Sequence, residues 1–260
     1  MSQRSAPKSV REGARRLVAG AREMEFGLTA AALAYYSLVA LAPAAVLLTA
    51  LLTTLWGDAV ATRVVGQAGS LLSPQGQELL ARAITGTSEA WEASVASAVV
   101  LLWGVLRLFR GLDTAMTEIY RTDRPVGHGF RDGVVAMGGV ALAVLLVFGA
   151  RVGATVTGTT LGGPGVVVAR VAVVAVLLFP LYYVLPNEDV SLVDALPGTL
   201  VASAGWELLR VAFGLYLVVV GTTTVSGIFG TVVLFVTWLF FGSGVVLVGG
   251  LVNAVLAGAR

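Results

Sequence analysis

The segment "WELLRVAFGLYLVVVG" (residues 206–221) carries an acid and a base, Glu207 and Arg210, inside an otherwise almost wholly apolar stretch. Each charge costs roughly 2.5–3.5 kcal/mol at the centre of a membrane-inserted helix. Residues three apart share a helix face, so the two side chains can neutralise each other there. The pair predicts either an internal salt bridge that fixes helix packing or part of a functional site.

Two further arginines, Arg151 and Arg170, also lie in apolar stretches. Three arginines that converge on one glutamate leave an excess of positive charge, and the planar guanidinium group suits phosphate or carboxylate. Arg151, Arg170, Glu207 and Arg210 are therefore our candidates for an anion-favouring intramembrane cavity. The alternative is that Arg151 and Arg170 extend separately to the outer headgroups.

Other polar side chains can line the same interior. Small and polar residues recur at helical spacing around Glu207, and a stripe of this kind should turn away from lipid. The stripe consists of Thr199, Ser203, Glu207, Arg210, Gly214 and Gly221. Tyr36 and Asn253 join Ser203 as possible lining residues because each needs a partner if it is buried in hydrocarbon. Ordinary packing of small residues is the alternative. Tyr182 and Tyr183 lie near the end of an apolar stretch, where an interfacial aromatic belt explains them.

The composition predicts that lipid is the solvent for most of the chain. Of 260 residues, 57% are hydrophobic and only 12% are charged, whereas soluble domains carry about a quarter charged residues. An open sheet edge is not viable in hydrocarbon, so apolar stretches near 20 residues are expected to be helices. The sequence thus predicts an all-α, polytopic membrane protein with six transmembrane helices and short amphipathic surface helices. The expected spans are about 28–55, 93–110, 133–157, 165–185, 196–220 and 229–256.

The distribution of basic residues predicts the orientation. The first 22 residues hold six Lys and Arg side chains, and the stretch around the end of the second span adds five, whereas residues 56–92 hold two. The positive-inside rule then places both termini in the cytoplasm and residues 56–92 outside. Residues 1–27 form a basic amphipathic segment expected to lie on anionic lipid headgroups at the cytoplasmic face, and residues 28–256 form the transmembrane domain.

Several classes of chemistry lack the residues they need. The chain has no cysteine and one histidine, His128, so we expect no metal site, no cofactor and no catalytic residue. The acids of the loop around His128 are interleaved with arginines, which is typical of a solvated charged loop rather than of a nuclease metal site. There is no Walker A sequence. The expected partners are the lipid bilayer and an anionic or lipid substrate, with no nucleic acid.

Four segments line up, in order, with one protein family. They are "AALAYYSLVALAP" (31–43), "LLWGVLRLFRGLDTAMTEIY" (101–120), "LPNEDVSLVDALPGTLVASAGWELLRVAFGLYL" (185–217) and "GIFGTVVLFVTWLFFGSGVVLVGGLVNAVL" (227–256). Together they resemble the YihY/BrkB family of bacterial and archaeal integral membrane proteins. The resemblance implies a six-helix cytoplasmic-membrane protein with links to the cell envelope or virulence, and lipid transport is proposed for some members. The label "ribonuclease BN" on some relatives looks like a misassignment.

One position departs from the family pattern. The family often has Gly-Ala-Glu-x-Asn near the end of the sixth span, where this chain reads Gly249-Gly250-Leu251-Val252-Asn253. Because Leu251 replaces the glutamate, no role of that carboxylate carries over. The resulting hypothesis is a transporter or lipid-handling protein with an anion-favouring cavity. The rival is a non-transporting envelope scaffold that docks partners through its charged cytoplasmic loop and its amphipathic amino terminus; an enzyme comes third.

Overall fold

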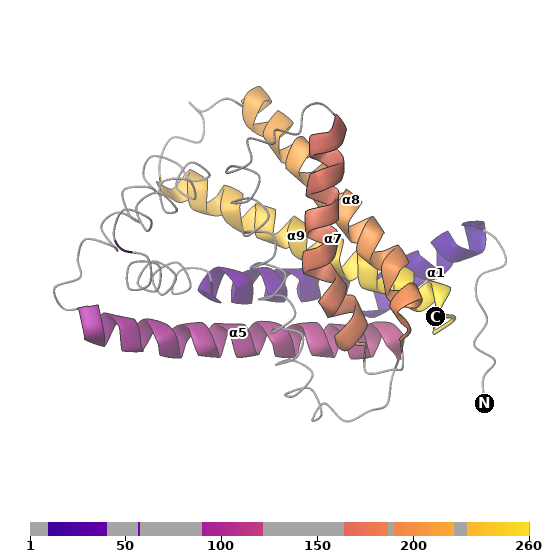
Figure 1. Cartoon of the computed structure of the whole chain (residues 1–260), viewed down its shortest axis with the longest axis horizontal. Helices are drawn as coiled ribbons and strands as arrows, with labels where there is room; N and C mark the ends of the chain where they lie inside the picture. The colour runs from indigo at the N-terminus through magenta and orange to yellow at the C-terminus, as the bar shows by residue number, and fades with distance from the viewer. Residues whose placement is uncertain are drawn as a thin grey trace. The chain divides into compact units, whose positions relative to one another are not determined.

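The computed structural model describes residues 10–40, 57, 90–121, 164–186, 190–220 and 228–259 of the chain (Figure 1). Throughout these ranges the regular structure is helical and no strand occurs, which confirms the all-α prediction. The helices are α1 (Val10–Glu23), the apolar helix Phe26–Ala40, α5 (Ala90–Tyr120), α7 (Pro164–Val184), α8 (Leu192–Val220) and α9 (Ile228–Leu256).

Where the structure describes an expected span, it is helical, and the bounds of several helices agree with the expected ones. The span expected at 93–110 continues as one helix to Tyr120, and α7 and α9 begin and end within a residue of the expected bounds. Among the described residues, two stretches are long and apolar enough to cross a membrane, Gly165–Val184 and Val233–Leu256. The span expected at 133–157 lies outside the described residues. The arrangement of six spans therefore stays a prediction.

A reciprocal cap starts α8 four residues before the expected span. The backbone N–H of Asp194 donates to Ser191 Oγ at 3.2 Å, and Asp194 Oδ2 accepts from the backbone N–H of Ser191 at 3.3 Å. This capping box satisfies N–H groups that a helix amino terminus leaves without intrahelical partners. The local pattern Ser-x-x-Asp, rather than the hydropathy of the span, fixes where α8 begins.

The chain divides into two compact units. The first contains Met1–Leu33, Phe109–Leu215 and Phe240–Arg260, and the second contains Ala34–Leu108 and Tyr216–Leu239. The first unit contains all of α7, most of α8 and the buried polar residues Thr199, Ser203 and Asn253. The second unit pairs the end of the helix Phe26–Ala40 with α5, where a Cβ on Gly104 would lie 3.2 Å from the backbone of Ala40.

Helices α8 and α9 run antiparallel within the first unit, and small residues bring their backbones together. A Cβ added at Gly198 would clash with the carbonyl oxygen of Gly249, and one added at Gly242 would lie 3.1 Å from Trp206. Gly198, early in α8, lies against Gly249, late in α9, whereas Trp206, later in α8, lies against Gly242, earlier in α9. The two helices therefore run in opposite directions. Backbones approach this closely only where the side chain is absent, as is common between membrane helices.

Helix α5 packs its carboxyl-terminal end into the same unit. Leu112, Ala115 and Ile119, which follow helical spacing, are all buried. Ile119 and Met116 lie against Gly250 of α9, where an added Cβ would be 3.0 Å from the Met116 sulfur. The apolar stripe that the sequence shows beyond residue 110 is therefore a packing face.

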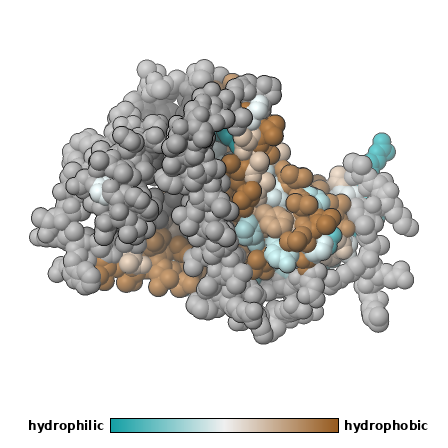
Figure 2. All heavy atoms as spheres, in the orientation of Figure 1, coloured by the Kyte–Doolittle hydropathy of each residue, from teal (hydrophilic) through white to brown (hydrophobic). Residues whose placement is uncertain are grey.

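The outward faces of α7 and α8 remain apolar. Val168 is 67% exposed and Leu208 is 69% exposed, and Figure 2 shows hydrophobic residues gathered over the part of the molecule where these two helices lie. Large exposed apolar faces are rare on soluble monomers. They are what a lipid solvent requires of a helix surface.

Candidate functional site

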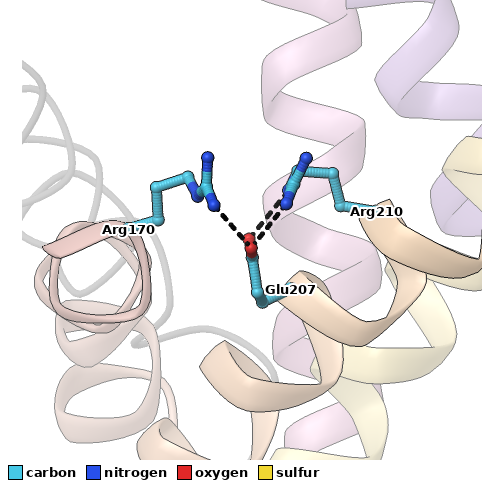
Figure 3. Close-up of polar contacts among 3 residues, drawn as sticks. All are labelled: Arg170, Glu207 and Arg210. Carbon is cyan, nitrogen blue, oxygen red and sulfur yellow. Dashed lines mark hydrogen bonds and ion pairs between the residues drawn. The ribbon is translucent and has the colours of Figure 1, made fainter. Parts of the chain in front are cut away.

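The carboxylate of Glu207 lies between the guanidinium groups of Arg170 and Arg210 (Figure 3). Arg210 donates through Nε to Glu207 Oε2 at 2.9 Å and through Nη2 to Oε1 at 2.6 Å. Arg170 reaches the same Oε1 with its Nη2 at 3.2 Å. The cluster therefore carries two positive charges against one negative charge.

The hairpin formed by α7 and α8 places these residues at the same depth. Arg170 lies about 21 Å before the end of α7 at Val184, and Glu207 lies about 23 Å after the start of α8 at Leu192, at the rise of an α-helix. A short connection joins the two helices, so equal distances from it bring the residues side by side in an antiparallel pair (Figure 1). Arg210 then follows Glu207 on the same face of α8.

The three side chains differ in exposure. Glu207 is 13% exposed, Arg170 is 36% exposed and Arg210 is 45% exposed. The Arg170 Nε atom is nevertheless buried, and it has no hydrogen-bond partner among the described residues. The centre of the cluster is thus an acid covered by two bases, one of which retains an unused buried donor.

The sequence-based candidates meet different outcomes. Arg170, Glu207 and Arg210 contact one another, and Arg151 lies outside the described residues. Arg170 does not extend alone, because it is paired with Glu207. The role of the cluster in binding an anion stays a prediction.

The polar stripe of α8 is buried near the start of the helix and exposed farther along, and its turning away from lipid stays a prediction. Thr199 and Ser203 are 1% and 0% exposed, respectively, as expected. Arg210 and Gly214, farther along the helix, are exposed at the surface of the chain. Gly198, near Thr199, approaches the backbone of Gly249 closely, whereas no described atom lies within 4 Å of a Cβ at Gly214.

Two of the expected lining residues have structural partners. Ser203 Oγ donates to the carbonyl of Thr199 in its own helix at 2.7 Å. Asn253 accepts from the backbone N–H of Gly198 and donates to the carbonyl of Ala195. Gly198 lies about 14 Å from Glu207 along α8, so these contacts favour packing over a place beside the arginines.

The third expected lining residue, Tyr36, belongs to the second unit. Its ring packs edge-on against Trp103 with 6.2 Å between ring centroids, and the guanidinium carbon of Arg107 lies 5.7 Å from the Trp103 ring centroid. Aromatic and cation–π contacts of this kind stabilise packing. They give Tyr36 a set of neighbours within its own unit.

Sequence reasoning missed the role of Tyr182. Tyr182 is 0% exposed, so the expectation of an interfacial position was wrong for it, whereas for Tyr183, which is 42% exposed, that position stays a prediction. The Tyr182 hydroxyl donates to the carbonyl of Val246 on α9 at 2.7 Å. A buried hydroxyl in an apolar environment needs such a partner, so Tyr182 ties α7 to α9.

The described residues contain no group of three or more His, Cys, Asp or Glu side chains placed to hold a metal ion. His128 lies outside those residues. The chemistry that the cluster of Arg170, Glu207 and Arg210 supports is electrostatic recognition through charge-assisted hydrogen bonds.

Comparison with known proteins places the chain beside membrane proteins. The family model described as virulence factor BrkB matches residues 17–260. A UPF0761 membrane protein of Methylibium petroleiphilum is 28% identical over 90% of this chain and 59% of its own length. A UPF0761 membrane protein of Aromatoleum aromaticum is 26% identical over 70% of this chain and 47% of its own length.

A third relative, a UPF0761 membrane protein of a Janthinobacterium species, is 26% identical over 65% of this chain and 41% of its own length. The chain spans about half the length of the curated relatives it matches. No solved structure matches it. The names of these relatives state a membrane protein and no activity.

Proposed function

Because the chain belongs to the virulence factor BrkB family, we propose that it is a six-helix protein of the cytoplasmic membrane that transports or handles an anionic or lipid substrate. The family relationship and the apolar surfaces of α7 and α8 support the membrane location. The single observation that carries the functional proposal is the cluster of Arg170, Glu207 and Arg210 on those helices.

The charge balance of the cluster supports an anionic substrate. Glu207 offsets one of the two guanidinium groups, and one positive charge of the cluster remains without a counter-ion among the described residues. An uncompensated charge at membrane depth is expensive and commonly marks a substrate or ion pathway. Guanidinium groups bind phosphate and carboxylate through paired N–H donors, which gives the cluster its selectivity for oxyanions. Arg151, outside the described residues, is proposed to add a further positive charge.

A transport assay with a charge-matched control tests the proposal. Purified chain is reconstituted into vesicles, and two rates are measured: uptake of radiolabelled phosphate and transbilayer movement of a fluorescent phosphatidic acid. We expect the chain to raise one of these rates above that of protein-free vesicles. Arg170→Gln/Arg210→Gln should abolish the increase, whereas Arg121→Gln/Arg124→Gln, which also removes two arginines, should retain it.

The outcomes separate the proposal from its rival. Circular dichroism of each reconstituted variant checks that the helices are retained. If neither rate rises with wild-type chain, or if the rates survive loss of Arg170 and Arg210, the transport proposal is overturned. Activity lost only on changes at Arg121 and Arg124 would place the function at the cytoplasmic loop instead.

The rival function is an envelope scaffold that docks on anionic lipid or on a partner. The observation that favours it is α1, whose basic side chains Arg11, Arg15 and Arg22 are exposed. A basic amphipathic helix binds an anionic membrane surface. Arg121 at the end of α5 pairs with Glu23 at the end of α1, which would hold α1 beside the α5 terminus for this purpose.

The orientation, with both termini in the cytoplasm, is part of the proposal. The excess of basic residues before residue 23 and around residues 107–131 supports it. Because the chain contains no cysteine, single cysteines can be placed at will and tested with a membrane-impermeant thiol reagent in intact cells. We expect labelling at a cysteine placed within residues 56–92 and none at a cysteine near residue 5. The opposite labelling pattern would reverse the orientation.

A further inference from the structure

The two arginines of the cluster contact the Glu207 carboxylate in different ways. Arg210 binds both carboxylate oxygens of Glu207, at 2.9 Å and 2.6 Å, which is a two-point pairing. Arg170 contacts only Oε1, at 3.2 Å, and Arg210 already occupies that oxygen. The carboxylate is therefore neutralised mainly by Arg210, and the remaining positive charge lies on Arg170.

Arg170 also keeps a donor that the fold leaves unsatisfied. Its Nε atom is buried and has no hydrogen-bond partner in the part of the chain that the structure describes. A buried N–H without a partner costs free energy, and such groups are rare enough in native structures to need an explanation. A ligand that accepts from this N–H explains it.

We propose that Arg170 is the ligand-binding residue of the cluster and takes one oxyanion, a phosphate or carboxylate group, while Glu207 and Arg210 form a neutral pair that positions it. This inference rests on the proposed function and names which residue meets the substrate. The ligand contacts the Nε–H and a neighbouring Nη–H of Arg170, the two-point geometry in which Arg210 already holds the Glu207 carboxylate.

The exposure of the side chain permits this contact. Arg170 is 36% exposed although its Nε is covered, and the proposal requires the side chain to turn until this N–H reaches the open side. The single 3.2 Å contact with Glu207 restrains that rotation weakly. Glu207 keeps its two bonds to Arg210 when Arg170 turns, so the acid does not lose its counter-ion.

Binding measurements on the full chain in neutral detergent test the assignment. Isothermal titration uses two probes, inorganic phosphate and dihexanoyl phosphatidic acid, which carry the same oxyanion chemistry. Binding of both with equal affinity assigns the site to a free phosphate group. Tighter binding of the phosphatidic acid assigns it to a lipid headgroup. Either result supports an oxyanion at Arg170 if the loss of Arg170 weakens binding more than the loss of Arg210.

Two double variants form the decisive comparison because both leave one arginine and no acid. Glu207→Gln/Arg210→Gln retains Arg170 but loses the pair that positions it, and we expect its affinity to fall by less than that of the second double variant. Glu207→Gln/Arg170→Gln retains Arg210, and we expect its affinity to fall by at least about tenfold, the loss of one or two charge-assisted hydrogen bonds. Equal affinity in the two variants would overturn the assignment while leaving an anion site in place.

Arg170→Lys keeps both the positive charge and a partner for Glu207, so it guards against a loss of fold. The ammonium group has no Nε–H and no planar fork, and we expect it to weaken binding by about tenfold. Wild-type affinity in this variant would show that charge alone is recognised and would overturn the assignment. Absence of binding to wild-type chain would instead overturn the proposed function itself, so the two failures are distinguishable.

Discussion

The side-chain oxygen of Asn253 on α9 accepts a hydrogen bond from the backbone N–H of Gly198 on α8 at 2.6 Å. The amide nitrogen of the same side chain donates to the carbonyl of Ala195 at 3.1 Å. Asn253 is 1% exposed, so both halves of a buried amide are satisfied by the neighbouring helix. The contact fixes the register of α9 against the start of α8.

We expect Asn253→Leu to destabilise the protein. The leucine leaves the Gly198 N–H without its side-chain acceptor, and an unsatisfied buried group costs about 1–3 kcal/mol. Thermal unfolding of the detergent-solubilised chain, followed by circular dichroism, should show a lower Tm. Ser203→Ala is the control, since Ser203 bonds only its own helix and its loss should change the Tm little. Equal Tm values for the two variants would contradict an interhelical role of Asn253.

Gly249→Ala should also destabilise the protein, because its Cβ would clash with the Tyr182 hydroxyl and lie 2.7 Å from the carbonyl oxygen of Gly198. Overpacking of this kind costs about 1–3 kcal/mol. The matched control is Gly214→Ala, where no atom of the described residues lies within 4 Å of the added Cβ, and where alanine should stabilise the helix by up to about 1 kcal/mol. Opposite shifts in Tm are expected. A neutral Gly249→Ala would mean that α7, α8 and α9 pack less closely than described.

The start of α8 depends on the capping box between Ser191 and Asp194. We expect Ser191→Ala to lower the stability by about 1 kcal/mol because the Asp194 N–H loses its side-chain acceptor and keeps only the Ser191 carbonyl. Ser191→Thr retains a capping hydroxyl and should cost less than half as much. Hydrogen exchange at the first turn of α8 measures the effect locally, and unchanged protection in the alanine variant would argue against the cap.

The spacing of residues along single helices predicted much of this arrangement. The bond between Glu207 and Arg210 depends on two positions three apart in one helix, and local geometry determines it. The bounds of α7 and α9 followed from hydropathy, whereas Ser191 and Asp194 set the start of α8 by a local rule. With the observed bounds of α7 and α8, helical rise puts Arg170 and Glu207 at similar distances from the connection between the two helices.

The sequence did not predict how each helix is rotated about its own axis, and therefore which of its faces is buried. Tyr182 and Tyr183 are adjacent and chemically identical, yet one is buried and the other is 42% exposed. Hydropathy does not distinguish them, because lipid and protein interior are similarly apolar. The partners of Asn253 and the buried Nε of Arg170 depend in the same way on which faces of α7, α8 and α9 meet.

A comparison of the stability of a single and a double charge-removing variant tests the electrostatics of the cluster. Glu207→Gln leaves Arg170 and Arg210 facing each other without a carboxylate, whereas Glu207→Gln/Arg210→Gln leaves one arginine and restores the wild-type net charge of the cluster. Removing one partner of a desolvated pair is more damaging than removing both. We therefore expect the single variant to have the lower Tm. Added salt should reduce the difference in Tm between the two variants, since counter-ions screen the repulsion between the partly exposed guanidinium groups. A double variant less stable than the single one would show that Arg210 stabilises the fold by packing rather than by its charge.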